Sequence, residues 1–139
     1  MYDNIAKLCR VLEIKSRVGV EAQRAYKSDN KEILKKIADE VLPELLNRVV
    51  DFHESVYVQW VTECKANGYD VLDLRLGGLE SRIKTAIKRI NLYINGDIDI
   101  LEELAEERLS IDGRTDEELA KKETYCNNFW ICAATASNI

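Results

Sequence analysis

Apolar residues recur every three or four positions through most of the chain, and this spacing predicts helices that each bury one face. The first such pattern runs from Ile5 to Tyr26. Asp3 or Asn4 can cap its start, because a side-chain oxygen there can accept a hydrogen bond from a free backbone N–H. The polar residues at 28–30 end the pattern. We therefore expect a first long helix over this stretch.

A second pattern begins after Asn30, a further candidate cap, and ends at Asn67 and Gly68, where glycine suits a helix stop. Its inward positions are Ile33, Leu34, Ile37, Val41, Leu45, Val49, Phe52, Val56 and Trp60. Pro43 interrupts this stretch, because proline lacks an N–H donor and crowds the preceding turn. Either the helix bends there or a new helix begins with Pro43 in its first turn. Glu44 favours the new start, because it complements the helix dipole.

The third pattern is the most regular, and Gly96 stops it after Asn95. Its apolar positions alternate by four and three without a gap: Leu72, Leu76, Leu79, Ile83, Ala86, Ile90 and Tyr93. Gly77 and Gly78 lie inside this pattern, where two glycines cost a helix about 1–2 kcal/mol relative to alanine. Close approach of another backbone is the usual reason for such a pair, so we expect another element to pack against it.

The rest of the chain predicts shorter helices. Asp97 can cap a fourth helix, with a solvated acidic face. Its apolar positions are Ile98, Leu101, Leu104 and Leu109. Asp116 can cap a last helical piece that reaches toward Tyr125, and the apolar residues at 129–134 are expected to pack onto another surface. Residues 1–139 are thus predicted to form a single all-α domain, a bundle of about four to five helices, the long ones antiparallel, with an irregular C-terminal tail.

Charge and composition exclude some classes of binding partner. The chain carries 20 Lys and Arg against 25 Asp and Glu, a formal net charge of −5, which gives no reason to expect a nucleic acid partner. No segment has the apolar length of a membrane span and the N-terminus lacks a signal-peptide pattern, so no membrane partner is expected. Cys9, Cys64, Cys126 and Cys132 form no Cys-x-x-Cys pair. We expect reduced, half-buried packing residues of a cytoplasmic protein.

Candidate chemistry is sparse. His53 is the one histidine and no Glu-x-x-His pair occurs, so no metal or other cofactor is expected. Glu40 and Glu44 lie one helical turn apart, as do Glu103 and Glu107. General acid–base catalysis needs a pocket that separates the pKa values of two such groups, and only charged and helix-forming residues flank these pairs. We expect solvated carboxylates.

Arg48 and His53 match the Arg-x4-His spacing of the all-helical ribonucleases called HEPN, in which the two residues act on a phosphodiester. Residues five apart on a helix point about 140° from each other, and Val49 stands where those enzymes usually carry a polar residue. A surface or hydrogen-bonded histidine is the favoured interpretation, and a small ribonuclease is the alternative. Four aromatic residues can stack on sugar rings, but packing in a core or an interface is favoured for them: Tyr57, Trp60, Tyr125 and Trp130.

The block at residues 71–82 places two glycines between Asp73-x-Arg75 and Leu79-x-x-Arg82. It resembles the C-terminal helical domain of bacterial β-N-acetylhexosaminidases of glycoside hydrolase family 20. The resemblance extends to Ala86, Arg89, Tyr93 and Gly96, to residues 101–104 and 106–109, to the segments 41–46, 53–54 and 59–60, and to the ending 130–139. Departures from the family pattern, at 64–68 and 134–136, fall at connecting positions.

The resemblance implies an accessory role. In these enzymes the chemistry belongs to a TIM barrel, in which an adjacent Asp-Glu pair protonates the leaving group and supports attack by the substrate's own acetamido group. A barrel of that kind needs about 250 residues, so this chain of 139 residues cannot hold one and we assign it no catalytic residue. We expect the chain alone to be inactive and the parent protein to be a glycoside hydrolase.

The resemblance further implies that the domain packs against the missing barrel and stabilises it, helps to form a homo-oligomer, or forms one wall of the sugar cleft. The predicted interface or structural residues are Asp73, Arg75, Gly77, Gly78, Arg82, Arg89, Trp60 and Trp130. The charged residues among them are expected to form ion pairs with neighbouring helices or with the barrel, and a solvated charged face is the alternative. A free-standing helical interaction protein is the remaining possibility.

Overall fold

The computed structural model describes residues 2–106, and they form an α-helical fold. The elements are α1 (Tyr2–Lys27), α2 (Lys31–Lys36), the π-helical turn η1 (Ile37–Val41), α3 (Leu42–Glu63), α4 (Tyr69–Asn95) and α5 (Glu102–Ala105). No strand occurs in this range. The predicted all-α class is confirmed.

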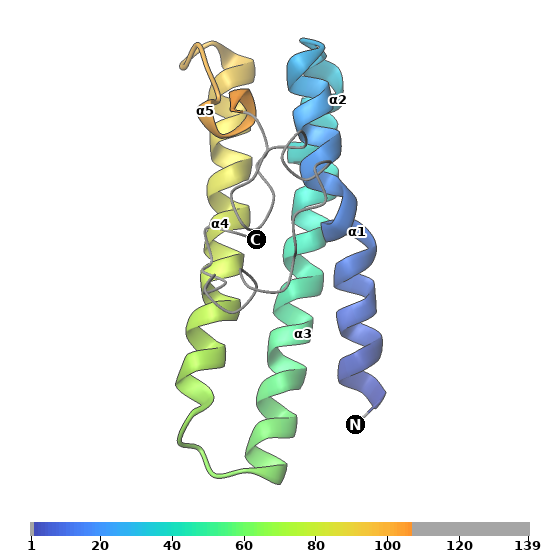
Figure 1. The fold of residues 1–139 in the computed structure, drawn as a ribbon, viewed down its shortest axis with the longest axis vertical. Helices are drawn as coiled ribbons and strands as arrows, with labels where there is room; N and C mark the ends of the chain where they lie inside the picture. The colour runs from blue at the N-terminus through green and yellow to red at the C-terminus, as the bar shows by residue number, and fades with distance from the viewer. Residues whose placement is uncertain (1, 107–139) are drawn as a thin grey trace, which may run out of the picture. The chain divides into compact units, whose positions relative to one another are not determined.

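The central helix of the bundle is α3. Figure 1 shows α1 and α4 on its two sides. Both pack against α3, and they also meet each other near their far ends, where the Tyr26 ring of α1 lies 5.4 Å from the Tyr93 ring of α4. At the far end from the N-terminus, α2 and η1 pack against both outer helices, and α5 packs against α1. α3 therefore supplies the contacts that join the two outer helices over the half of the bundle that carries residue 2.

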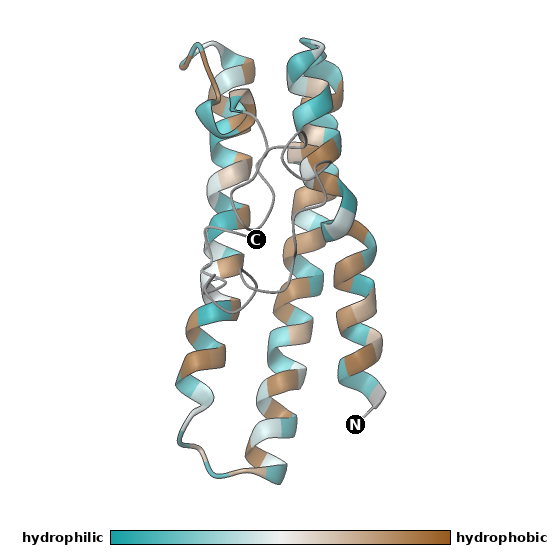
Figure 2. Cartoon of the chain, in the orientation of Figure 1, coloured by the Kyte–Doolittle hydropathy of each residue, from teal (hydrophilic) through white to brown (hydrophobic). Residues whose placement is uncertain are grey.

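The hydrophobic core lies in the half of the bundle that contains α2 and η1. Its buried residues are Val11, Ala22, Ala25, Leu34, Ile37, Ala38, Leu42, Leu45, Val49, Ile83, Ile90 and Leu101. Hydrophobic residues also occur along the long helices in the other half (Figure 2). There, among residues 3–10 and 50–82, only Ser55 is buried. This half is thinly packed within the described residues.

The start of α1 differs from the sequence prediction. The helix begins at Tyr2, so Asp3 and Asn4 lie within the first turn and neither is the cap. Asp3 pairs with Lys7 one turn later, at 3.5 Å. The Asn4 amide donates to the side chain of Gln59 on α3. A polar side chain near a helix start can pair across the bundle as readily as it can cap, and spacing along the sequence does not distinguish the two.

Asn30 joins α1 to α2 and confirms the predicted cap. Its backbone N–H donates to the carbonyl of Ala25 at 2.9 Å, while Asp29, at φ +50°, closes the preceding turn. This is the Schellman arrangement that satisfies free carbonyls at a helix end. The Asn30 side chain then accepts a hydrogen bond from the Ile33 N–H at 3.1 Å. One residue thus ends the first helix and starts the second.

Replacing Asn30 with alanine is expected to lower the free energy of unfolding by about 1 kcal/mol, because the Ile33 N–H loses its acceptor. Urea titration of the 139-residue chain, followed by circular dichroism, measures this change. Asn30→Asp keeps the accepting oxygen and serves as the control. An alanine variant as stable as the parent chain, or an aspartate variant as unstable as alanine, would show that this cap does not stabilise the fold.

Pro43 is accommodated by a widened helical turn. The N–H of Leu42 donates to the carbonyl of Ile37, five residues back, which is the π-helical hydrogen bond. A π-turn holds an extra residue, and it precedes a proline whose ring would crowd an ordinary α-turn. α3 begins at Leu42 with Pro43 in its first turn, as one of the two alternatives predicted, but Val41 before it is helical and no side chain caps the start, so the chain passes from η1 into α3 without a break. Ile37 and Ala38 stay in the core.

α3 ends one turn before the predicted stop. The last helical residue is Glu63, and Cys64 is extended. The Trp60 indole N–H donates to the carbonyl of Lys65 at 2.8 Å and holds the departing chain against the helix. Gly68 does adopt a left-handed conformation, at φ +96°, but it precedes α4 rather than ending α3. Gly68 is therefore a turn residue, as predicted, but it precedes α4, and the prediction that it ends α3 is wrong.

α4 confirms the most regular pattern, and Gly96 ends it at φ +80°. The N–H of Asp97 donates to the carbonyl of Leu92 at 2.9 Å, completing a second Schellman arrangement. Asp97 therefore belongs to the end of α4, and the prediction that it caps a fourth helix is wrong, because α5 begins only at Glu102. The predictions for Leu109, for the helical piece from Asp116 toward Tyr125 and for the apolar stretch at 129–134 lie outside the described residues.

Candidate functional site

His53 lies between two carboxylates of α4. Its Nδ1 is 2.9 Å from Glu80 Oε1 and its Nε2 is 3.2 Å from Asp73 Oδ1. The two carboxylates are seven residues apart and therefore share one face of the helix. Glu80 is largely buried, with 19% of its side chain exposed, whereas 63% of the Asp73 side chain is exposed. Both ring nitrogens thus lie within hydrogen-bonding distance of a carboxylate of α4, so His53 ties α3 to α4.

Tyr69 stacks on this histidine and joins it to two further aromatic rings of α3. The Tyr69 ring lies 5.3 Å from Tyr57, 6.2 Å from Trp60 and 6.3 Å from the His53 ring, measured between centroids. Burial raises the pKa of the Tyr69 hydroxyl, and the nearby Asp73 carboxylate adds to the effect. Tyr57 and Trp60 thus pack in an aromatic cluster at this helix–helix junction. Tyr125 and Trp130 lie outside the described residues.

His53→Ala is expected to lower the free energy of unfolding by about 1 kcal/mol, because the largely buried Glu80 carboxylate loses its donor. A double-mutant cycle with Glu80→Ala, measured by urea unfolding, gives the coupling between the two side chains. Asp73→Ala is the matched control, since it removes the exposed partner of the same ring and should cost less. Equal costs for the two carboxylates would contradict the role assigned to burial.

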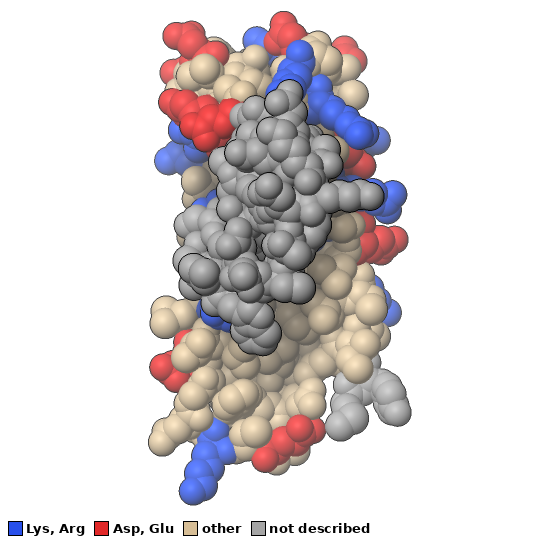
Figure 3. Space-filling view, in the orientation of Figure 1, with Lys and Arg blue, Asp and Glu red and all other residues tan. Residues whose placement is uncertain are grey.

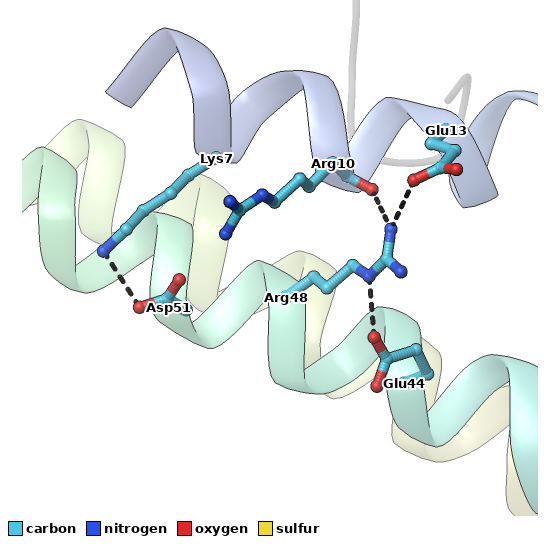
Figure 4. Close-up of a pocket in the computed structure, with 6 residues that line it drawn as sticks. All are labelled: Lys7, Arg10, Glu13, Glu44, Arg48 and Asp51. Carbon is cyan, nitrogen blue, oxygen red and sulfur yellow. Dashed lines mark hydrogen bonds and ion pairs between the residues drawn. The ribbon is translucent and has the colours of Figure 1, made fainter. Parts of the chain in front are cut away.

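An open pocket of about 380 Å³ lies on the α1–α3 seam (Figure 4). Its lining is charged throughout and consists of Lys7, Arg10, Glu13, Glu44, Arg48 and Asp51. Arg48 donates from Nε to Glu44 and from Nη1 to Glu13 and to the Arg10 carbonyl, each at 2.8 Å. The hydrogen bonds to the two carboxylates, that to Glu44 foremost, raise the pKa of the guanidinium.

The pocket is largely neutralised by its own ion pairs. Lys7 lies 2.9 Å from Asp51, and this hydrogen bond raises the pKa of the ammonium. Arg48 is held by two carboxylates, one on its own helix and one on α1. The carboxylate of Glu44 is engaged with Arg48, and Glu40 is exposed. The pocket therefore joins α1 to α3 through salt bridges.

The structure does not bring Arg48 and His53 together. Arg48 binds residues of α1 and its own helix, whereas His53 binds Asp73 and Glu80 on α4. The two side chains point to opposite neighbours of α3, as expected for residues five apart on a helix. The described part of the chain thus offers no shared site at which both could act on one phosphodiester, and the ribonuclease alternative gains no support.

Arg89 pairs with the short helix that follows α4. It lies 2.6 Å from Glu102 and 2.6 Å from Glu103. The hydrogen bond from Arg89 lowers the pKa of Glu103. Arg75 and Arg82, two and one heptads earlier on α4, are exposed and make no ion pair within residues 2–106. Glu107 lies outside the described residues.

Gly77 and Gly78 lie inside α4, with open space beside them. Among residues 2–106, no atom of another element lies within 4 Å of the point where a Cβ would stand on either residue. The expectation that a neighbouring helix of the bundle approaches this pair is therefore wrong for the described helices. Within this part of the molecule, their helical cost has no compensating contact.

Cys9 and Cys64 are free thiols and both are exposed, so the predicted packing role is wrong for these two cysteines. Cys126 and Cys132 lie outside the described residues. Residues 2–106 contain no cluster of three or more His, Cys, Asp or Glu side chains that could hold a metal. None of the helices described is both long and apolar enough to span a bilayer.

The fold places this chain among small α-helical bundle domains. Comparison with known families identifies it further: residues 1–124 match the family described as the Glycoside Hydrolase 20C C-terminal domain. The chain belongs to this family, and the resemblance found in the sequence is confirmed. The domain is thus an accessory part of a family 20 hexosaminidase, associated with the catalytic domain of the same protein. No match was found among curated proteins.

Proposed function

We propose that this domain packs against the TIM-barrel catalytic domain of a β-N-acetylhexosaminidase and stabilises it. Membership of the C-terminal domain family carries the proposal, since a domain of that family accompanies a catalytic domain. The barrel performs the glycoside hydrolysis, and the helical domain contributes surface rather than catalytic groups.

The distribution of exposed apolar side chains supports docking. Most of the exposed large hydrophobic residues lie in the thinly packed half of the bundle: Ile5, Leu8, Val50, Tyr57, Val58, Val61, Val71 and Leu74. Figure 3 shows that the surface of this half is largely uncharged on the face in view. Exposed apolar side chains concentrated in one part of a folded domain are typical of a contact site. Burying it contributes about 25 cal/mol for each Å² removed from water.

Calorimetry of the full-length enzyme tests the proposal. Reading the coding DNA upstream of the Met1 codon identifies the barrel to be produced with this domain. We expect the intact enzyme to unfold in one cooperative transition, above the temperature at which the catalytic domain alone unfolds. Two independent transitions, with the catalytic domain as stable alone as in the intact enzyme, would contradict a stabilising role.

A further inference from the structure

The outward face of α4 carries a straight stripe of residues. Its members recur at intervals of three and four, and they are Val71, Leu74, Gly78, Ser81 and Thr85. Such alternation keeps residues on one line along a helix and is typical of a seam that packs on another helix. The α4 residues that contact His53 of α3, and the core residues Ile83 and Ile90, lie elsewhere around the helix.

The apolar end of this stripe is strongly exposed. Leu74 is 76% exposed, the highest value among the large hydrophobic side chains described, and Val71 is 53% exposed. Gly78 follows in the stripe with Gly77 beside it, and no neighbouring atom explains either glycine. Alanine would fit the open space and favour the helix, so the bundle itself does not require glycine here. A backbone that packs closely against α4 from outside the bundle does require glycine, because a Cβ would hold it away.

Arginines flank the stripe at seven-residue intervals. Arg89 binds Glu102 and Glu103 on the short α5, which shows how this row meets carboxylates of an adjacent helix. Arg75 and Arg82 occupy the same row two and one heptads earlier and have no such partner in residues 2–106. Their charges are complementary to a partner with acidic residues beside its apolar seam.

This charge pattern disfavours a second copy of the same helix. In an antiparallel pair, equivalent flanking positions face each other. Arg75 of one copy would then lie opposite Arg82 of the other, and like charges placed opposite each other across an interface repel. The row of arginines instead fits a different helix, one that carries carboxylates.

The position of the stripe suits a preceding domain. α4 begins at the end of the bundle that also carries the start of α1 (Figure 1). A C-terminal domain is joined to the rest of its enzyme through its N-terminal end, so the catalytic domain is tethered near Val71 and Leu74. A TIM barrel is surrounded by helices, and a helix is therefore the element that it presents to a neighbour.

We propose that the α4 stripe receives one outer helix of the catalytic barrel, with that helix closest to Gly77 and Gly78 and its carboxylates paired with Arg75 and Arg82. This inference rests on the proposed function and adds the docking surface and the chemistry of the partner helix.

Charge reversal in the full-length enzyme tests it. The variant carries Arg75→Glu with Arg82→Glu, and the matched control carries Lys36→Glu with Lys84→Glu, exposed cations of α2 and α4 that lie off the stripe. Hydrogen–deuterium exchange followed by mass spectrometry reports protection along residues 71–85 and on the barrel. We expect the arginine variant to exchange about tenfold faster on α4 and on one barrel helix, because like charges across the interface repel. The lysine control should exchange like the parent enzyme.

Reversing the carboxylates of the affected barrel helix to lysine should restore protection in the arginine variant. Unchanged exchange in that variant, while the parent enzyme still unfolds in one transition, would overturn the α4 assignment and leave the proposed function intact. Two independent transitions in the parent enzyme would instead refute the proposed function. Cross-links from α4 to a second copy or to residues 107–139, in place of the barrel, would also overturn the assignment.

Discussion

Replacing Leu34 with alanine is expected to lower the free energy of unfolding by about 3 kcal/mol, the largest effect of any single substitution considered. The Leu34 side chain is completely buried, and it lies in α2 where that helix packs against α1 and α4. Truncation removes the transfer free energy of the buried methyl groups and leaves a cavity that close-packed neighbours fill only in part. Urea titration of the chain measures the change.

The adjacent Ile33 provides the control. Ile33 lies in the same helix but is 45% exposed. Ile33→Ala and Leu34→Ala change the helix propensity by similar small amounts. We therefore expect Ile33→Ala to change the free energy of unfolding by well under half as much as Leu34→Ala. Comparable losses for the two substitutions would mean that burial does not set the cost, because alanine is the better helix former at both positions. A small loss at Leu34 would mean that the core relaxes around the missing side chain.

Replacing both Gly77 and Gly78 with alanine is expected to raise the free energy of unfolding of the chain by about 2 kcal/mol, about 1 kcal/mol for each residue. Both lie inside α4, and the space beside each is open, so a methyl group meets no obstacle. Alanine has less conformational freedom than glycine in the unfolded chain, so less entropy is lost when the helix forms. Thermal and urea unfolding of the double variant measure the gain.

Gly68 and Gly96 are the matched controls, because their φ angles of +96° and +80° are left-handed. Alanine at either position is strained whatever the space, so Gly68→Ala and Gly96→Ala should lower stability. A double variant at 77 and 78 that is no more stable than the parent would indicate that the pair has a role inside the domain. A gain in the isolated chain together with faster exchange at residues 71–85 in the full-length enzyme would agree with a docking role.

Much of the fold follows from local signals. The regular spacing in α4, its stop at Gly96 and the cap at Asn30 were all read correctly, because helix propagation and capping depend on residues a few positions apart. Two other helix starts were predicted wrongly. Asn4 pairs with α3, and Asp97 closes α4. These polar residues had two possible partners each, and the tertiary arrangement selected one.

The contacts of candidate residues were less predictable. The spacing of Arg48 and His53 disfavoured one shared site, but it did not say which residues each one contacts; α1 and α4 lie on opposite sides of α3 and take one residue each. The salt bridges of His53 with Asp73 and Glu80 join segments far apart in the sequence, and no local pattern marks them. The sequence predicted Glu44 as a solvated carboxylate and did not predict that it and Glu13 bind Arg48.

By itself the sequence determined the helical class, the course of α4 and the family, because periodicity and the motif at residues 71–82 are properties of neighbouring positions. The tertiary structure decided which faces meet. It buried Leu34 and Val49, paired His53 with α4 and Arg48 with α1, and left Leu74 and the two glycines facing outward. The reason is that the rotation and register of one helix against another depend on the packing of all their side chains together, and that information is not contained in any single segment.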